Sequence, residues 1–296
     1  MNKLIFIDTN IFLDFYRFRN SDISLKYLDI IDKHHDKIIC SSQVEMEFKK
    51  HRTEEIIRTY NAITTPDWNS LSSPAILADS EPANIITKQK KEIAKQLKTL
   101  RKRIIKILEN PATNDKVYQT LQRLFKDKTS DINLYRDNEA KHRLRKLAIK
   151  RFYLGYPPRK KDDTSIGDSL NWEWIIDCAS RQNKDIIIVS RDTDFGQFIQ
   201  DRSFINDWLS IEFKERVNKK RKITLTNNLS SAFKEAISKQ SVTKKMESAE
   251  QQVILDTQVE KQVKAESPLE NLTLETSEDR MKRIFEIIKK YRDNKK

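Results

Sequence analysis

A short apolar run near the start of the chain constrains the fold more than any other feature of the sequence. Residues 4–7 are Leu, Ile, Phe and Ile, and the run ends at Asp8. Such a run is typical of a strand that is covered on both faces, as in a parallel sheet between helices. Thr9 and Asn10 then favour a turn or helix start, and apolar residues recur at helical spacing from residue 11 onwards. The pattern predicts a strand, a carboxylate and a helix in succession, although Asp8 at this position is equally suited to capping the helix.

Two more apolar runs have the same form. Residues 37–40 and 185–190 are short, rich in isoleucine and followed directly by polar residues. Helical patterns separate all three runs, which predicts βα units and a mainly parallel sheet. We therefore expect an α/β fold with three α/β/α layers. Residues 195–199 are expected to begin a helix, and residues 208–213 and 223–225 to form short edge strands.

Composition along the chain suggests three parts. Residues 1–239 are expected to form the α/β domain, with residues 62–155 as a basic helical insertion. Residues 240–276 contain no aromatic residue and are rich in Lys, Glu, Gln and Ser, so we expect a flexible linker there. Residues 277–296 regain a helical period and predict an amphipathic C-terminal helix, which would dock on the domain, on a protein partner or on a second copy.

The positive charge is concentrated in the predicted insertion. Residues 88–151 hold 20 Lys or Arg against 7 Asp or Glu, an excess of 13 that equals the net charge of the whole chain, +13. A solvated helical face is one explanation. An element with charge of one sign is also what the capture of a polyanion requires, which favours nucleic acid as the partner.

Other bulk features exclude several classes of protein. Only 3 glycines are present, which argues against a glycine-rich phosphate loop. No apolar run approaches the roughly 18 residues of a membrane span, and Asp8 and Asp14 interrupt any signal-like segment. Cys40 and Cys178 lie far apart in apolar runs and are expected to be buried thiols of a cytoplasmic protein.

Carboxylates are expected to meet at one edge of the predicted sheet. Asp8 and Asp192 follow strands, Glu47 lies on the apolar face of the helix after the second strand, and Asp168 starts the helix before the third. A helix that leads into a strand begins at the edge where the preceding strand ended, so all four share that edge. Asp194 is a possible fifth member.

Carboxylates gathered in this way repel one another unless cations neutralise them, and hard divalent cations with oxygen ligands are the usual solution. The expected cofactor is Mg²⁺ or Mn²⁺, which activates water in phosphodiester cleavage. Each acid also has a simpler explanation: Glu47 as a surface residue, Asp168 as a helix cap and Asp194 as a turn former.

Four sequence blocks follow one another along the chain: the strand ending in Asp8-Thr9-Asn10, Val44-x-x-Glu47, Gly167-Asp168-Ser169, and Ser190-Arg191-Asp192-x-Asp194. In this order they resemble the PIN-domain nucleases. The resemblance implies that Asp8, Glu47, Asp168 and Asp192 are metal-binding catalytic acids, with Asp194 assisting. It implies supporting roles for Asn10 and Ser190, and a preference for RNA. Glu45 is a rival to Glu47, on a different face of the same helix.

The expected function is therefore that of a metal-dependent endonuclease, with RNA as the expected substrate. Cations near the acids are expected to contact the nucleic acid, unless they are ordinary loop charges: Arg159, Lys160, Lys161 and Arg191. Two alternatives stay open. One is a structure-specific DNA nuclease with the same site, and the other is a non-catalytic nucleic-acid- or partner-binding module.

Overall fold

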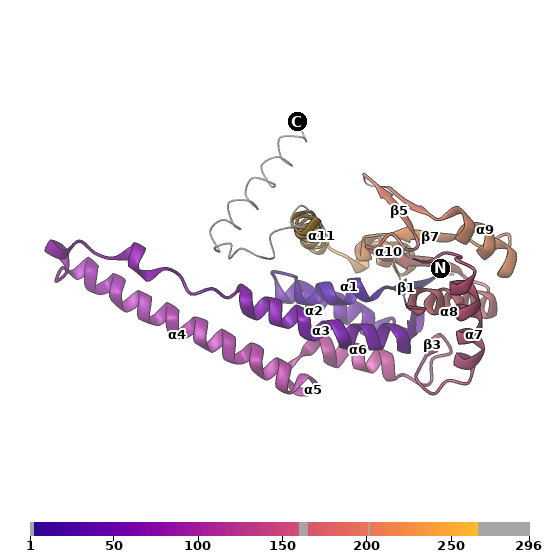
Figure 1. The fold of residues 1–296 in the computed structure, drawn as a ribbon, viewed down its shortest axis with the longest axis horizontal. Helices are drawn as coiled ribbons and strands as arrows, with labels where there is room; N and C mark the ends of the chain where they lie inside the picture. Colours follow the sequence, from indigo (N-terminus) through magenta and orange to yellow (C-terminus); the bar gives the residue numbers. More distant parts are fainter. Residues whose placement is uncertain (1–2, 160–164, 201, 266–296) are drawn as a thin grey trace.

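The computed structural model describes residues 3–159, 165–200 and 202–265 (Figure 1). Its centre is a five-stranded sheet in the order β3-β2-β1-β4-β7. The strands are β1 (Lys3–Ile7), β2 (Ile38–Ser41), β3 (Asn133–Leu134), β4 (Asp185–Val189) and β7 (Ile223–Thr226). All four pairings between them are parallel. The strand order reverses between β1 and β4, which is where ligands bind in open parallel sheets.

Helices cover both faces of this sheet, which gives the predicted three-layer α/β/α fold. α6 (Lys116–Lys126) and α10 (Leu229–Ala236) pack against strands, with α2 (Ser21–Lys33) beside α6. The other face is covered by α8 (Gly167–Gln182), against which α7 (Ala140–Tyr153) and α9 (Asp207–Arg216) pack. The side chains of residues 4–7 and 186–189 are all buried. An uninterrupted apolar strand is stable here because both of its faces are covered.

The predicted insertion is divided between the core and a protruding arm. β3 extends the sheet by pairing with β2, and Phe125 of α6 packs its ring against Phe12 and Phe48. Residues 116–153 therefore include elements that pack on the sheet or extend it, and within the predicted insertion over residues 62–155 the protruding part is shorter. A two-residue strand leaves too short a pattern to be recognised in sequence.

The arm itself is residues 63–114, which extend away from the sheet in Figure 1. It consists of a connection with two 3₁₀ turns, the long helix α4 (Glu81–Glu109) and the short α5 (Pro111–Asn114). At its base, Arg52 of α3 (Ser42–Ala62) pairs with Asp115 and donates to the carbonyl of Ile107. These buried charge-assisted bonds fix the direction in which the arm leaves the core.

Two predictions beyond β4 are wrong. Residues 196–199 form β5 (Gly196–Ile199), which pairs with β6 (Arg202–Ile205) in a hairpin, and residues 208–213 lie in α9. A Cβ at position 196 would lie 2.0 Å from the carbonyl oxygen of Phe204, so glycine permits the close approach of the hairpin. In α9, Leu209 and Phe213 are buried four residues apart. This spacing fits one face of a helix but also one face of a strand, so the short segment did not distinguish the two.

The predicted flexible linker is helical over much of its length. α11 (Lys244–Ala265) packs against α2 and α10. It buries Met246, Glu250 and Val253, which recur every three or four residues and so lie on one helical face. The lack of aromatic residues in this part of the chain favoured a linker, but a helix can pack through a narrow face of smaller apolar side chains. The predicted C-terminal helix at residues 277–296 lies outside the described residues.

Candidate active site

A cluster of hydrogen bonds joins the ends of β1 and β4. Ser190 Oγ donates to Asp8 at 2.6 Å, and the side-chain amide of Asn10 donates to Asp8 at 2.8 Å and to Asp192 at 3.1 Å. The backbone N–H of Thr9 gives Asp8 a third donor at 2.7 Å, as expected of a residue that also caps the short helix α1 (Thr9–Leu13). The amide of Asn10 thus bridges the carboxylates of Asp8 and Asp192, and Ser190 gives Asp8 a further donor.

Glu47 reaches the same cluster from α3. The hydroxyl of Thr9 donates to one carboxylate oxygen of Glu47 at 2.9 Å, and Gln43 donates to the other at 2.7 Å. Its rival, Glu45, pairs instead with Lys49 at 2.6 Å one helical turn away. The structure therefore places Glu47, and not Glu45, beside Asp8.

The start of α8 closes on Glu47. A Cβ at Gly167 would lie 2.7 Å from the carboxylate of Glu47 and 2.7 Å from the amide of Gln43, so the absence of a side chain at this position allows the close contact. Asp168 is the next residue and is the acid of the first turn of α8. Asp194 is buried two residues beyond Asp192. The predicted acids thus lie on elements that meet at the switch point of the sheet.

The electrostatics of Asp8 follow from this arrangement. Burial, with a smaller contribution from the carboxylates of Asp192 and Glu47, raises the pKa of Asp8 to about 7 against the lowering effect of the Ser190 and Thr9 hydrogen bonds. The carboxylates of Asp8, Asp192 and Glu47 therefore concentrate negative charge at this point. The donor set is carboxylate, amide and hydroxyl oxygen, which fits Mg²⁺ or Mn²⁺. Within the described residues, no three His, Cys, Asp or Glu side chains converge as a ready-made metal cage.

The side chain of Arg191, which was predicted to contact nucleic acid, is bonded to buried acids and not to this cluster. Its side chain is 8% exposed, and its guanidinium pairs with buried Asp14 at 2.5 Å and with Glu250 at 3.7 Å. Glu250 in turn accepts hydrogen bonds from the backbone N–H groups of Leu229 and Ser230 at the start of α10. Arg191 therefore anchors the loop that carries Asp192 to α11, because the buried acids offer its charge better partners than solvent.

Of the other three predicted nucleic-acid contacts, the structure describes Arg159. Arg159 is exposed, donates to the carbonyl of Phe152 at 3.0 Å and stacks its guanidinium on the Phe152 ring at 4.3 Å. It thus lies at the end of α7. Lys160 and Lys161 lie outside the described residues.

Sequence reasoning missed three residues of the site. Thr9 and Gln43 hold Glu47, and Glu250 holds Arg191 from a helix that was expected to be a linker. Gln43 was detectable, since it lies four residues before Glu47 and therefore on the same helical face. Glu250 had no such signal, because its partners lie twenty or more residues away in the chain.

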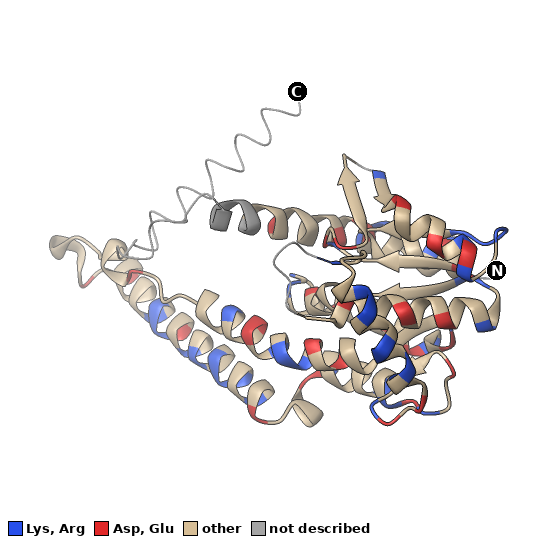
Figure 2. Ribbon diagram, turned by 45° about the vertical axis from the view of Figure 1, so that its right-hand side comes forward, with Lys and Arg blue, Asp and Glu red and all other residues tan. Residues whose placement is uncertain are grey.

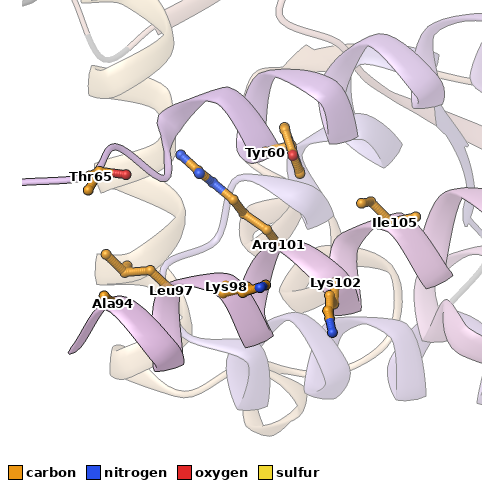
Figure 3. Close-up of a pocket in the computed structure, with 8 residues that line it drawn as sticks. All are labelled: Tyr60, Thr65, Ala94, Leu97, Lys98, Arg101, Lys102 and Ile105. Carbon is orange, nitrogen blue, oxygen red and sulfur yellow. The ribbon is translucent and has the colours of Figure 1, made fainter. Parts of the chain in front are cut away.

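The arm carries a second feature, far from the acids. A cavity of about 390 Å³ lies between the end of α3 and α4 (Figure 3). Lys98, Arg101 and Lys102 line it together with Tyr60, and its eight lining residues include no acid. Arg101 is held by the Tyr60 ring at 5.7 Å and by the carbonyl of Ile63. Tyr60 lies 13 residues beyond Glu47 on α3, or about 20 Å along the helix, so this cavity is separate from the candidate site.

Taken together, the fold and the site define an α/β protein with acidic side chains at the switch point of a parallel sheet. A family model described as a PIN like domain matches residues 4–196, and the chain belongs to this PIN-like family. PIN domains are generally nucleases. Searches of curated proteins and of solved structures gave no significant match. No helix among the described residues is long and apolar enough to span a membrane.

Proposed function

We propose that this protein is a metal-dependent endonuclease that hydrolyses phosphodiester bonds in RNA in the cytoplasm. The observation that carries the proposal is the buried Asp8 carboxylate, which is hydrogen-bonded together with Asp192 through Asn10 and is close enough to Glu47 to feel its charge. A site that concentrates negative charge where a ligand enters needs a cation to bind an anionic substrate.

Each residue has a definite task in this proposal. A bound Mg²⁺ or Mn²⁺ would supply an activated water and neutralise charge on the phosphate. Asp8, Glu47, Asp168 and Asp192 would hold it, with Asp194 assisting. Ser190 and Asn10 fix the rotamers of Asp8 and Asp192, and Thr9 and Gln43 fix Glu47. Partners of this kind keep ligands oriented before the metal arrives.

The arm supports nucleic acid as the substrate. Six lysines of α4 recur every three or four residues and therefore form one line along the helix: Lys88, Lys91, Lys95, Lys98, Lys102 and Lys106. All six are exposed, and Figure 2 shows blue segments along this helix. The line extends over about 27 Å, which suits a phosphate backbone that continues beyond the site of cleavage.

The decisive experiment compares two neighbouring glutamates. Glu47→Gln is expected to lower Mn²⁺-dependent cleavage of a labelled single-stranded RNA by at least about 100-fold, since even the partners of metal ligands typically matter by 10- to 100-fold. Glu45→Gln, two residues away and paired with Lys49, is the matched control and should cleave normally. Calorimetry with Mn²⁺ alone should show the same contrast. Equal activity and equal Mn²⁺ binding in both variants would exclude an enzyme of this kind and favour a non-catalytic binding module.

The same assay separates RNA from DNA as the target. Matched single-stranded RNA, single-stranded DNA and duplexes are incubated with the protein and Mn²⁺. Cleavage confined to branched or duplex DNA would replace the proposed substrate with that of a structure-specific DNA nuclease.

A further inference from the structure

Three aromatic side chains are exposed where α7 ends and α9 begins, and two of them are in contact. Tyr153 is 82% exposed, Tyr156 40% and Trp208 50%. The rings of Tyr156 and Trp208 are in contact, with their centroids 5.2 Å apart. We call these three residues the aromatic platform. Large apolar groups gathered on a surface usually mark a binding site.

The backbone holds the platform in a fixed conformation. Gly155, with φ +71°, ends α7 in a left-handed conformation. The N–H of Tyr156 then bonds to the carbonyl of Arg151 at 3.1 Å, and the N–H of Gly155 to that of Phe152 at 3.1 Å. This pair of bonds is the Schellman motif, which sets the direction of the chain after a helix. Tyr153 and Tyr156 are therefore positioned by the same turn.

A buried arginine joins the three helices beneath the platform. Arg151 of α7 donates to Glu173 of α8 at 3.0 Å, to Glu212 of α9 and to the carbonyl of Pro157. Glu212 also accepts from the indole of buried Trp172 at 3.1 Å. Tyr156 and Trp208 thus stand on elements that are bonded to one another and do not need to be ordered when a ligand binds.

The platform adjoins the candidate active site through two of these elements. The N–H of Asn206, which caps α9 two residues before Trp208, bonds to the carbonyl of Phe195 at 2.9 Å. Phe195 follows directly after Asp194. On the other side, α8 carries Asp168 in its first turn. The elements that carry the rings are therefore hydrogen-bonded to the helix that carries Asp168 and to the residue that follows Asp194.

Cations border the rings. Lys146 and Lys150 of α7 are exposed and precede Tyr153 on the same helical ridge, at a spacing of four and then three residues. The exposed Arg159 lies at the end of the same helix, stacked on Phe152. Rings with neighbouring positive charges match a ligand that has both flat apolar faces and phosphates.

We propose that the aromatic platform stacks unpaired bases of single-stranded RNA next to the scissile phosphate, while Lys146, Lys150 and Arg159 contact the backbone. This proposal rests on the proposed nuclease function and specifies its substrate as a single strand. Bases in a duplex are already stacked on their neighbours, so only an unpaired strand can offer their faces to a protein. Because every base has such a face, the platform would be tolerant of sequence.

The first test measures RNA affinity without cleavage. Binding of a labelled single-stranded RNA is followed by fluorescence anisotropy in EDTA. Trp208→Ala and Tyr156→Ala should each weaken binding by between about 5-fold and 100-fold, and Trp208→Phe should keep most of the affinity. Ile211→Ala is the matched control, because Ile211 is exposed on the same helix three residues away but has no aromatic face. A loss in Ile211→Ala equal to that in Trp208→Ala would overturn base stacking.

A second measurement detects stacking directly. Trp172 and Trp174 are buried, but Trp68 lies partly exposed on the arm, so the measurement uses a Trp68→Phe background. In that background, quenching of tryptophan fluorescence by single-stranded RNA should come mainly from Trp208 and be lost when Trp208→Phe is added. Unchanged quenching in that variant would overturn the proposal. So would a Trp208→Ala protein that binds RNA normally but loses self-association in light scattering, since the surface would then be an interface between copies.

The two proposals fail differently. If the wild type cleaves RNA with Mn²⁺ and the alanine variants have an unchanged KM, the platform is refuted and the nuclease function stands. If the wild type never cleaves but the variants lose affinity for single strands, the platform stands and the nuclease function is refuted.

Discussion

The replacement of Glu250 tests the most unexpected part of the structure, the docking of α11. The Glu250 carboxylate is 1% exposed. It accepts hydrogen bonds from Leu229 N–H, from Ser230 N–H at 3.0 Å and from the Tyr27 hydroxyl at 3.1 Å, and it faces Arg191. Glu250→Gln keeps the volume of the side chain but removes its charge and turns an N–H₂ group toward donors.

The expected loss of stability is about 3 kcal/mol. Removal of one partner from a buried charge pair typically costs about 3–5 kcal/mol, and Arg191 keeps Asp14 as a second partner, which favours the lower end. For a chain of this size, 1 kcal/mol corresponds to a change in Tm of about 2 °C. Glu250→Gln should therefore melt about 6 °C below the wild type.

Glu247→Gln is the matched control for this measurement. Glu247 lies one turn earlier on α11 and pairs at 2.6 Å with Lys234, and both side chains are about one third exposed. Such a surface pair contributes at most about 1 kcal/mol, so its Tm should fall by no more than about 2 °C. Urea denaturation followed by circular dichroism gives the two free energies of unfolding. Equal values for the two variants would refute a docked α11 and restore the flexible linker.

Three further predictions concern charge. Asp8→Asn should stabilise the metal-free protein. Because the pKa of Asp8 is raised to about 7, its contribution to stability is lost as the pH rises from about 3.8 to about 7. In urea titrations with EDTA, the free energy of unfolding gained by Asp8→Asn should grow over this range, and a constant difference would contradict the prediction. At Glu173, burial raises the pKa, but hydrogen bonds and charges from Arg216 and Arg151 outweigh this effect and lower the pKa below 4.5. The contribution of Glu173 to stability is therefore complete above pH 4.5 and is lost as the pH falls through the lowered pKa. The destabilisation measured for Glu173→Gln should accordingly shrink in acid. A triple change of arm lysines to Gln should reduce the slope of log K against log salt for single-stranded RNA by about 2; the set is Lys91, Lys95 and Lys102. The control is the same triple change just before β7, which should leave the slope unchanged; this set is Lys219, Lys220 and Lys222. Equal slopes in the two variants would exclude the arm as a contact of the RNA backbone.

The sequence alone determined the sheet core and the residues that end its strands. Uninterrupted apolar runs such as residues 4–7, followed by Asp8, require a strand covered on both faces and a polar group at its end. Helical spacing placed Glu47 on the inner face of α3 and favoured it over Glu45. These features depend on neighbours within a few residues, so local patterns record them.

Only the tertiary structure decided which charges serve the site and which serve the fold. Arg191 and Asp192 are adjacent in sequence, yet one side chain is bonded to Asp14 and Glu250 and the other to Asn10. The same holds for α11, whose narrow apolar face looks like a linker until α2 and α10 cover it. The free energy of a buried charge depends on partners that are remote in the chain, and the local pattern of a sequence contains no record of those partners.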